Sequence, residues 1–199
     1  ALHIAVELEN IEISDKSKLT IIGEYSFTNS SIRTIFIPKE LKEIKEFSFS
    51  GCKNLHTINF SQESTLEIIG KQSFSNTMIE TISIPKTVQK INEGAFFQCK
   101  KLRQIQFSEN SILELIDKRA FSNSSIENIK IPSKVAQIEA GAFSGCLILK
   151  NIEFSDDSEL NLIGNSAFFR SGIKNIAIPS KVSQIESKSF QYCNDLKSI

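Results

Sequence analysis

The chain has 199 residues, 40% of them hydrophobic, and its 23 basic residues balance its 23 acidic ones. Balanced charge without a cluster of Lys and Arg argues against nucleic acid as a partner. No apolar run approaches the roughly 20 residues that cross a bilayer, so we expect no membrane insertion by this segment. The N-terminus shows neither a signal peptide nor a Met, which suggests a fragment of a longer protein.

Two residue types recur at a fixed step of 47 residues. They are Cys52, Cys99, Cys146 and Cys193, and Pro38, Pro85, Pro132 and Pro179. Such a period predicts a solenoid, in which each unit covers the apolar face of its neighbour. Each block divides into a coil of 24 residues and one of 23. Coils begin at Leu8, Ile32, Leu55, Ile79, Leu102, Ile126, Leu149 and Ile173, with a truncated ninth at Leu196. We therefore expect one domain over residues 1–199.

Each coil opens with the pattern L-x-x-I-x-I/F, as in residues 126–131. Apolar residues at alternate positions predict a short strand that points them inward and leaves polar residues outside. Strands of this kind in register would form a parallel sheet. The short coils then carry Ile-Pro and the long coils Ser-x-x-Ser, both of which are typical of turns.

A second apolar pair follows the turn in each coil, for example Leu41 with Ile44 and Val88 with Ile91. It predicts a second short strand on another side of the coil. The coil ends with a small residue and a phenylalanine, as in Ala95-Phe96. We expect these phenylalanines to form a buried aromatic column, each within a tight helical turn.

The four cysteines are predicted to be buried free thiols at the coil corners. Equivalent positions two coils apart should lie about 9 to 10 Å apart, because neighbouring strands are about 4.8 Å apart. A disulfide needs Cα atoms within about 7 Å, so no bridge is expected. The same spacing prevents two cysteines from sharing a zinc ion. The acidic loop at residues 156–159 lacks the spacing of a calcium site. We expect no metal and no cofactor.

The full coil pattern, L-x-x-I-x-I-P-x-x-V-x-x-I-x-x-x-A-F-x-x-C, resembles the BspA-like class of leucine-rich repeats over nearly the whole chain. Residues 126–146 fit it at every marked position, whereas the long coils replace Pro with Ser and Cys with Asn or Ser-rich turns. The resemblance implies a leucine-rich repeat solenoid of right-handed coils. It also implies a surface antigen of bacteria or parasitic protists that attaches to host cells, extracellular matrix proteins or other microbes.

The outward positions of the first strands supply the candidate binding residues. These are Arg33, Thr34, Phe36, His56, Asn59, Glu80, Arg103, Gln106 and Lys130. The Thr and Asn residues at one outward position of successive coils could bind a polypeptide or a glycan. They could instead simply form hydrogen bonds across strands. The column of alternating charges could form ion pairs between strands. Phe36 is either an exposed contact residue or a ring packed against the neighbouring coil.

These features favour a non-catalytic recognition module, because no nucleophile is arranged beside His56. Cys52 lies close in sequence but should point into the core. The resemblance implies a location at the cell surface or in a secreted protein. An intracellular scaffold for protein partners is the alternative, since four free cysteines suit a reducing compartment. The apolar residues near both ends, Leu2 and Ile4 and then Leu196 and Ile199, allow end-to-end association of the fragment.

Overall fold

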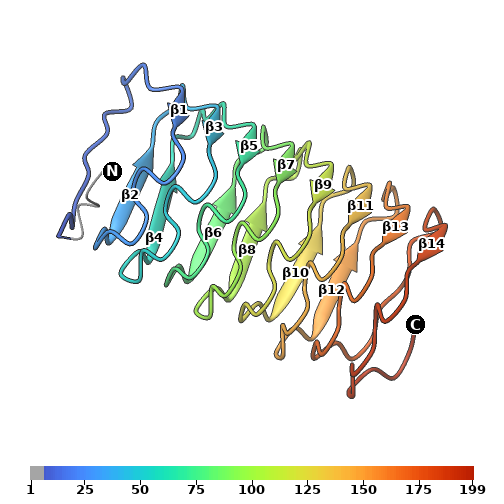
Figure 1. Cartoon of the computed structure of the whole chain (residues 1–199). Coiled ribbons are helices and arrows are strands. Elements are labelled where there is room, and N and C mark those ends of the chain that lie inside the picture. The colour runs from blue at the N-terminus through green and yellow to red at the C-terminus, as the bar shows by residue number, and fades with distance from the viewer. Residues whose placement is uncertain (1–6) are drawn as a thin grey trace.

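The computed structural model describes residues 7–199 as a single stack of coils whose strands are all parallel (Figure 1). Leu2 and Ile4, which were expected at an uncovered edge, lie outside the described residues. Every strand pairs with the strand of a neighbouring coil, so hydrogen bonds run along the stack. The expected solenoid with a parallel sheet on one side is confirmed.

The second strands form one continuous sheet of eight strands along one side of the stack. They are β1 (Ile21–Ile22), β3 (Glu43–Ile44), β5 (Ile68–Ile69), β7 (Lys90–Ile91), β9 (Leu115–Ile116), β11 (Gln137–Ile138), β13 (Leu162–Ile163) and β14 (Gln184–Ile185). From β1 to β13 the second residue of each strand is a buried isoleucine. The predicted second strand is therefore confirmed.

The first strands are four residues long, and they do not form one sheet. They are β2 (Thr34–Ile37), β4 (Thr57–Phe60), β6 (Thr81–Ile84), β8 (Gln104–Phe107), β10 (Asn128–Ile131) and β12 (Asn151–Phe154). β2 pairs with β4, and β6, β8, β10 and β12 form a separate sheet. In the coils that begin at Leu8 and Ile173, the first strand is reduced to single bridges at Asn10 and Asn175.

Pairing between first strands alternates along the stack. The pairs β2–β4, β6–β8 and β10–β12 each match all four residues, whereas β8–β10 matches one and β4–β6 none. Proline explains this alternation. The N–H of Ser61 donates to the carbonyl of Ile37 in the preceding coil (3.0 Å). Pro85 stands at the corresponding position of the next coil and has no N–H to donate. Each short coil thus lacks one bond to the long coil before it.

Phenylalanine rings stack along the centre of the molecule. Neighbouring rings from Phe27 to Phe190 lie 5.1–5.5 Å apart between centroids and within 18° of parallel. The six rings from Phe49 to Phe168 are completely buried, whereas the two end rings are partly exposed. The predicted aromatic column is confirmed, and it joins all eight coils into one core.

The segment around each phenylalanine consists of hydrogen-bonded turns, so the expected helical turns are not confirmed: residues 7–199 contain no helix. Residues two positions before and two positions after each core ring have positive φ, for example Arg119 (54°) and Asn123 (57°) around Phe121. Such a backbone favours Gly and Asn. It accounts for Gly145 and Asn123 at equivalent corners of adjacent coils.

All four cysteines are free and buried, as predicted. Each thiol contacts a hydroxyl and a carbonyl of the preceding coil. Cys99, for example, lies 3.3 Å from the hydroxyl of Thr77 and donates to the carbonyl of Phe74 at 3.1 Å. Burial raises the pKa of Cys99 and of Cys146 to about 11, so both thiols stay protonated and unreactive at neutral pH.

Candidate ligand-binding face

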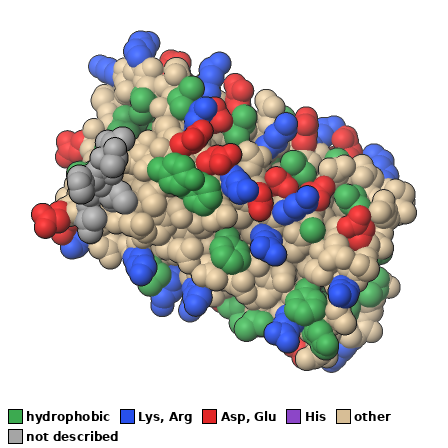
Figure 2. Space-filling view, in the orientation of Figure 1, with side chains coloured by type: hydrophobic (Ala, Val, Ile, Leu, Met, Phe, Trp, Pro, Cys, Tyr) green, Lys and Arg blue, Asp and Glu red, His purple; other side chains and the backbone are tan. Residues whose placement is uncertain are grey.

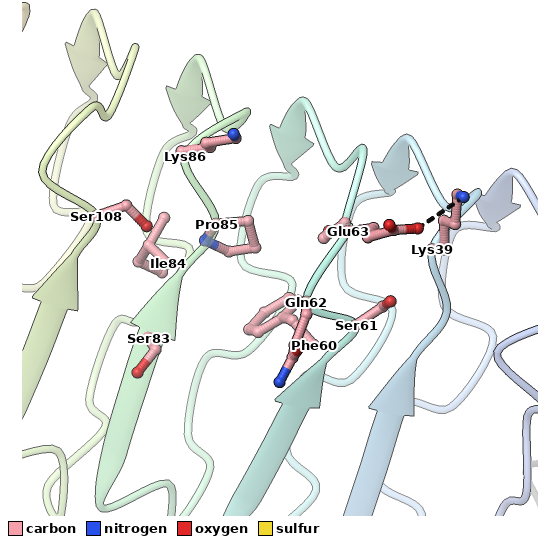
Figure 3. Close-up of a pocket in the computed structure, with 11 residues that line it drawn as sticks. Lys39, Phe60, Ser61, Gln62, Glu63, Ser83, Ile84, Pro85, Lys86 and Ser108 are labelled. Carbon is pink, nitrogen blue, oxygen red and sulfur yellow. Dashed lines mark hydrogen bonds and ion pairs between the residues drawn. The ribbon is translucent and has the colours of Figure 1, made fainter.

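The missing pairing between β4 and β6 opens a groove where these strands end. It has a volume of about 660 Å³. Figure 3 shows Phe60 extending from the end of β4 towards β6, with Ile84 and Pro85 on the opposite wall. Ser61 and Ser83 add hydroxyl groups to the lining. A partly exposed ring beside polar groups is the arrangement that binding sites use to fix a ligand.

A second groove of about 650 Å³ lies 47 residues further along, between the ends of β8 and β10. Its wall repeats the first. Phe107, Ile131 and Pro132 take the places of Phe60, Ile84 and Pro85. Ser108 lines both grooves, so the two border each other at this residue. We call the two grooves together the trough. Because each groove follows from one proline-bearing coil, its repetition is a property of the fold.

The two halves of the trough carry different charges. The first groove is lined by Lys39, Lys86 and Glu63, of which Lys39 and Glu63 form an ion pair at 2.8 Å (Figure 3). A hydrogen bond from Lys39 to Glu63 raises the pKa of the lysine. The second groove is lined by Lys130, Glu109 and Asp157. One basic group is therefore in excess in the first groove and one acidic group in the second.

The strand face beside the trough carries the predicted columns of polar side chains. Arg33 pairs with Glu9 (3.6 Å) and Arg103 with Glu127 (3.9 Å), so the expected ion pairs between strands are present. Both arginine side chains are more than half exposed, and such pairs contribute about 0–1 kcal/mol each. Figure 2 shows basic and acidic side chains interspersed on one face of the molecule.

Polar residues of the outward columns also bond across strands, as the simpler interpretation expected. The amide of Asn151 donates to Asn128 (2.7 Å), and the hydroxyl of Ser83 donates to Gln106 (3.1 Å). Thr34 lies opposite Thr57 in the register of β2 and β4. These bonds fix the side chains on the face but use up part of their capacity to bind a ligand.

The predicted binding residues fall into separate groups. Gln106 and Lys130 line the second groove of the trough. Arg103 and Lys130 line a smaller hollow of about 390 Å³ on the strand face. Asn59 lies on β4 and is exposed, and Phe36 on β2 is half-buried.

The other predicted residues lie at the starts of the first strands. His56 is exposed and contacts the hydroxyl of Thr57 (2.9 Å). Glu80 is also exposed and immediately precedes β6. Arg33, Thr34, His56 and Glu80 do not line the trough.

The trough itself did not emerge from sequence reasoning, although its signal is in the sequence. Proline and serine alternate at one register of successive coils, and each proline removes one backbone hydrogen bond between neighbouring strands. The prolines at this register predict a lost hydrogen bond as well as a turn. Such a loss predicts a gap between neighbouring strands just after Phe60 and just after Phe107.

Cys52 is buried and bonds the carbonyl of Phe27 (2.9 Å), so it points away from the exposed His56, as expected. Within residues 7–199 no three His, Cys, Asp or Glu side chains converge as metal ligands would. The described part of the chain also holds no helix long and apolar enough to cross a membrane.

Fold and site together define a repeat protein whose surface is an extended platform of side chains on stacked coils. The chain belongs to the BspA-type leucine-rich repeat family. The model of the BspA type leucine rich repeat region matches residues 4–83 and 67–197 in six copies. Family and fold together support a protein-interaction module.

Solved leucine-rich repeat proteins have the same fold. One from Bacteroides ovatus ATCC 8483 is 26% identical with a TM-score of 0.65, over 83% of this chain and 48% of that one. The T. pallidum leucine-rich repeat protein is 16% identical with a TM-score of 0.51, over 97% of this chain and 78% of that one. This chain thus spans about half of the Bacteroides protein. No curated protein sequence matches it significantly.

Proposed function

We propose that the chain is the non-catalytic recognition module of a cell-surface adhesin. It would attach its cell to host cells, extracellular matrix proteins or other microbes through the first-strand face and the trough. The observation that carries this proposal is the repetition of one groove with an equivalent wall at Phe60 and Phe107. Family membership supports the surface role.

An extended polypeptide segment suits the trough. The two grooves are two coils apart, which corresponds to about 10 Å when neighbouring strands are about 4.8 Å apart. A polyproline-II segment repeats every three residues, or about 9.3 Å, and presents every third side chain to the same side. Such a segment laid along the stack would place residues i and i+3 in successive grooves, against Phe60 and then Phe107.

Charge gives this segment a direction. Because Lys39 and Lys86 line the first groove, an acidic ligand residue is favoured there. Glu109 and Asp157 favour a basic residue at the second groove. The reverse orientation would place like charges together and lose affinity.

The proposal is tested by binding purified chain to immobilised matrix proteins and to unpermeabilised host cells. Lys86→Glu and Glu109→Lys reverse a charge in the first and second groove respectively, and Arg33→Glu and Arg103→Glu alter the strand face. We expect each groove variant to weaken binding about tenfold, because a misplaced charge at a contact costs roughly 1.4 kcal/mol or more. Lys90→Glu on β7, which belongs to the second-strand sheet, is the matched control and should bind normally.

Surface location is tested separately with antibodies against this chain on intact source cells. Signal that external protease removes supports the adhesin. Signal that appears only after permeabilisation contradicts it and moves the search to cytosolic partners. Equal binding by the groove variants and by Lys90→Glu would instead exclude the trough as the contact surface.

An intracellular scaffold that uses the same face is the second candidate, because all four thiols are free. Their burial weakens this argument. Thiols that are buried and protonated resist oxidation, so they are also compatible with an oxidising compartment.

A further inference from the structure

A second hollow lies on the turn side of the stack, apart from the first-strand face. It has a volume of about 560 Å³ and spans four coils. Arg119 and Ser122 come from the first of these coils, and Phe169, Lys188 and Tyr192 from the last two. None of its lining residues belongs to the trough. We call it the basic hollow.

Small residues in the coil that begins at Ile126 create the basic hollow. Its floor is formed by Ala140, Gly141 and Ser144. A Cβ added at Gly141 would lie 3.4 Å from the Cγ of Arg119, so the arginine stem borders the floor directly. Two coils earlier, the residue three positions after the equivalent Gly94 is Phe97, whose Cβ would lie 3.5 Å from an added Cβ. Here that residue is Ser144, whose Cβ would lie 3.8 Å from a Cβ added at Gly141 and whose side chain is much smaller.

The charged residues that line the basic hollow are both cationic: Arg119 and Lys188. Neither forms a salt bridge within residues 7–199. Glu186 accepts the N–H of the lining residue Asn165 (2.7 Å) and the amide of Gln184 (3.2 Å), but does not itself line the hollow. Because the lining holds two cations and no carboxylate, the hollow favours an anionic ligand.

Two aromatic rings form one wall. Phe169 and Tyr192 meet edge to face, with centroids 5.3 Å apart and planes at 84°. The guanidinium of Arg170 lies 5.4 Å from the first ring and 5.6 Å from the second, which holds both rings in place. Tyr192 is 56% exposed. Such a preformed apolar wall can pack against the C–H face of a sugar ring.

Part of the backbone of this region is used by the fold. The N–H groups of Arg119, Gly141 and Ser166 each donate to a carbonyl of the next coil, at 3.0, 2.9 and 3.0 Å. The residues that line the hollow lie in turns and not in strands, so no strand edge is offered here for an extended peptide. Recognition must come from side chains, among them the hydroxyls of Ser122 and Ser144 and the amide of Gln191. Hydroxyls and amides match the donors and acceptors of a sugar.

We propose that the basic hollow binds an anionic saccharide. Arg119 and Lys188 would pair with its carboxylate or sulfate groups, and Phe169 and Tyr192 would pack against a sugar ring. The volume is within the range of small-molecule sites and suits a short oligosaccharide. The chain would then engage glycan on its turn side independently of any protein ligand held on its first-strand face.

Isothermal titration calorimetry of the 199-residue chain tests the proposal with four probes. They are a heparin-derived hexasaccharide, a hexamer of galacturonic acid, neutral maltohexaose and a hexaglutamate peptide. We expect at least one acidic oligosaccharide to bind about tenfold more tightly than maltohexaose or hexaglutamate. Binding of heparin alone identifies sulfate as the recognised group, and binding of the galacturonate hexamer identifies carboxylate.

Three variants distinguish a specific saccharide site from nonspecific attraction of anions to the positive charge of the surface. Arg119→Gln with Lys188→Gln should weaken binding about tenfold, and Tyr192→Ala about fivefold without any change in charge. Lys150→Gln with Lys174→Gln removes the same charge from the first-strand face and should leave affinity unchanged.

Four results would overturn the proposal: no binding of either acidic oligosaccharide, equal binding of hexaglutamate, equal loss in the Lys150 and Lys174 control, or full affinity in Tyr192→Ala.

Discussion

The phenylalanine column predicts how much a single residue contributes to stability. Phe121 stacks on Phe96 and Phe143, both at 5.4 Å, and is completely buried. Phe121→Ala should lower the free energy of unfolding by about 3–5 kcal/mol, because it leaves a cavity between two rings. Phe27 has one neighbour in the column and is partly exposed, so Phe27→Ala should cost less. Urea denaturation of both variants measures the difference, and equal costs would contradict it.

The buried cysteines predict a loss of stability at high pH. Burial raises the pKa of Cys99 and Cys146 from 9.0 to about 11. The thiol ionises first in the unfolded chain, so its contribution is complete below pH 9 and is lost as pH rises from about 9 to about 11. The loss should reach about 2–3 kcal/mol for each thiol.

Urea denaturation between pH 8 and pH 11 measures this loss. Lys and Tyr residues also titrate in this range, so the control is the Cys99→Ala and Cys146→Ala double variant. Its stability should decline less steeply than that of the parent chain. Parallel decline in both proteins would refute the assignment to these thiols.

At the scale of the strand, the break between β4 and β6 predicts uneven amide protection. The N–H of Arg103 donates to the carbonyl of Glu80 (2.9 Å), and the N–H of His56 donates to that of Arg33 (3.0 Å). Among the backbone hydrogen bonds of residues 7–199, none starts at the N–H of Glu80. Its amide should exchange with deuterium at least about tenfold faster than that of Arg103, as NMR would detect. Similar protection of both amides would show that the strands pair in solution.

Repeat spacing and apolar columns were enough to predict the coils, both strands and the buried ring at Phe121. The binding surfaces were harder to predict. The trough depends on a hydrogen bond that Pro85 cannot donate, and the sequence contains that information. The basic hollow depends on which side chains face outward from a turn with positive φ at Arg119 and Gly141. Such a turn lacks the alternation of a strand, so its outward positions could not be read from the pattern.

At the scale of the whole molecule, stacking of coils rather than surface charge should determine stability. The six ion pairs of the described chain all join partly exposed side chains. Salt screens such pairs, which contribute about 0–1 kcal/mol each. Raising NaCl from 0.05 to 1 M should therefore lower the free energy of unfolding by less than about 3 kcal/mol, less than the loss of the single ring of Phe121. Urea denaturation at both salt concentrations measures the change. If salt lowers the free energy of unfolding by more than Phe121→Ala does, the ion pairs contribute more to stability than a ring of the aromatic column.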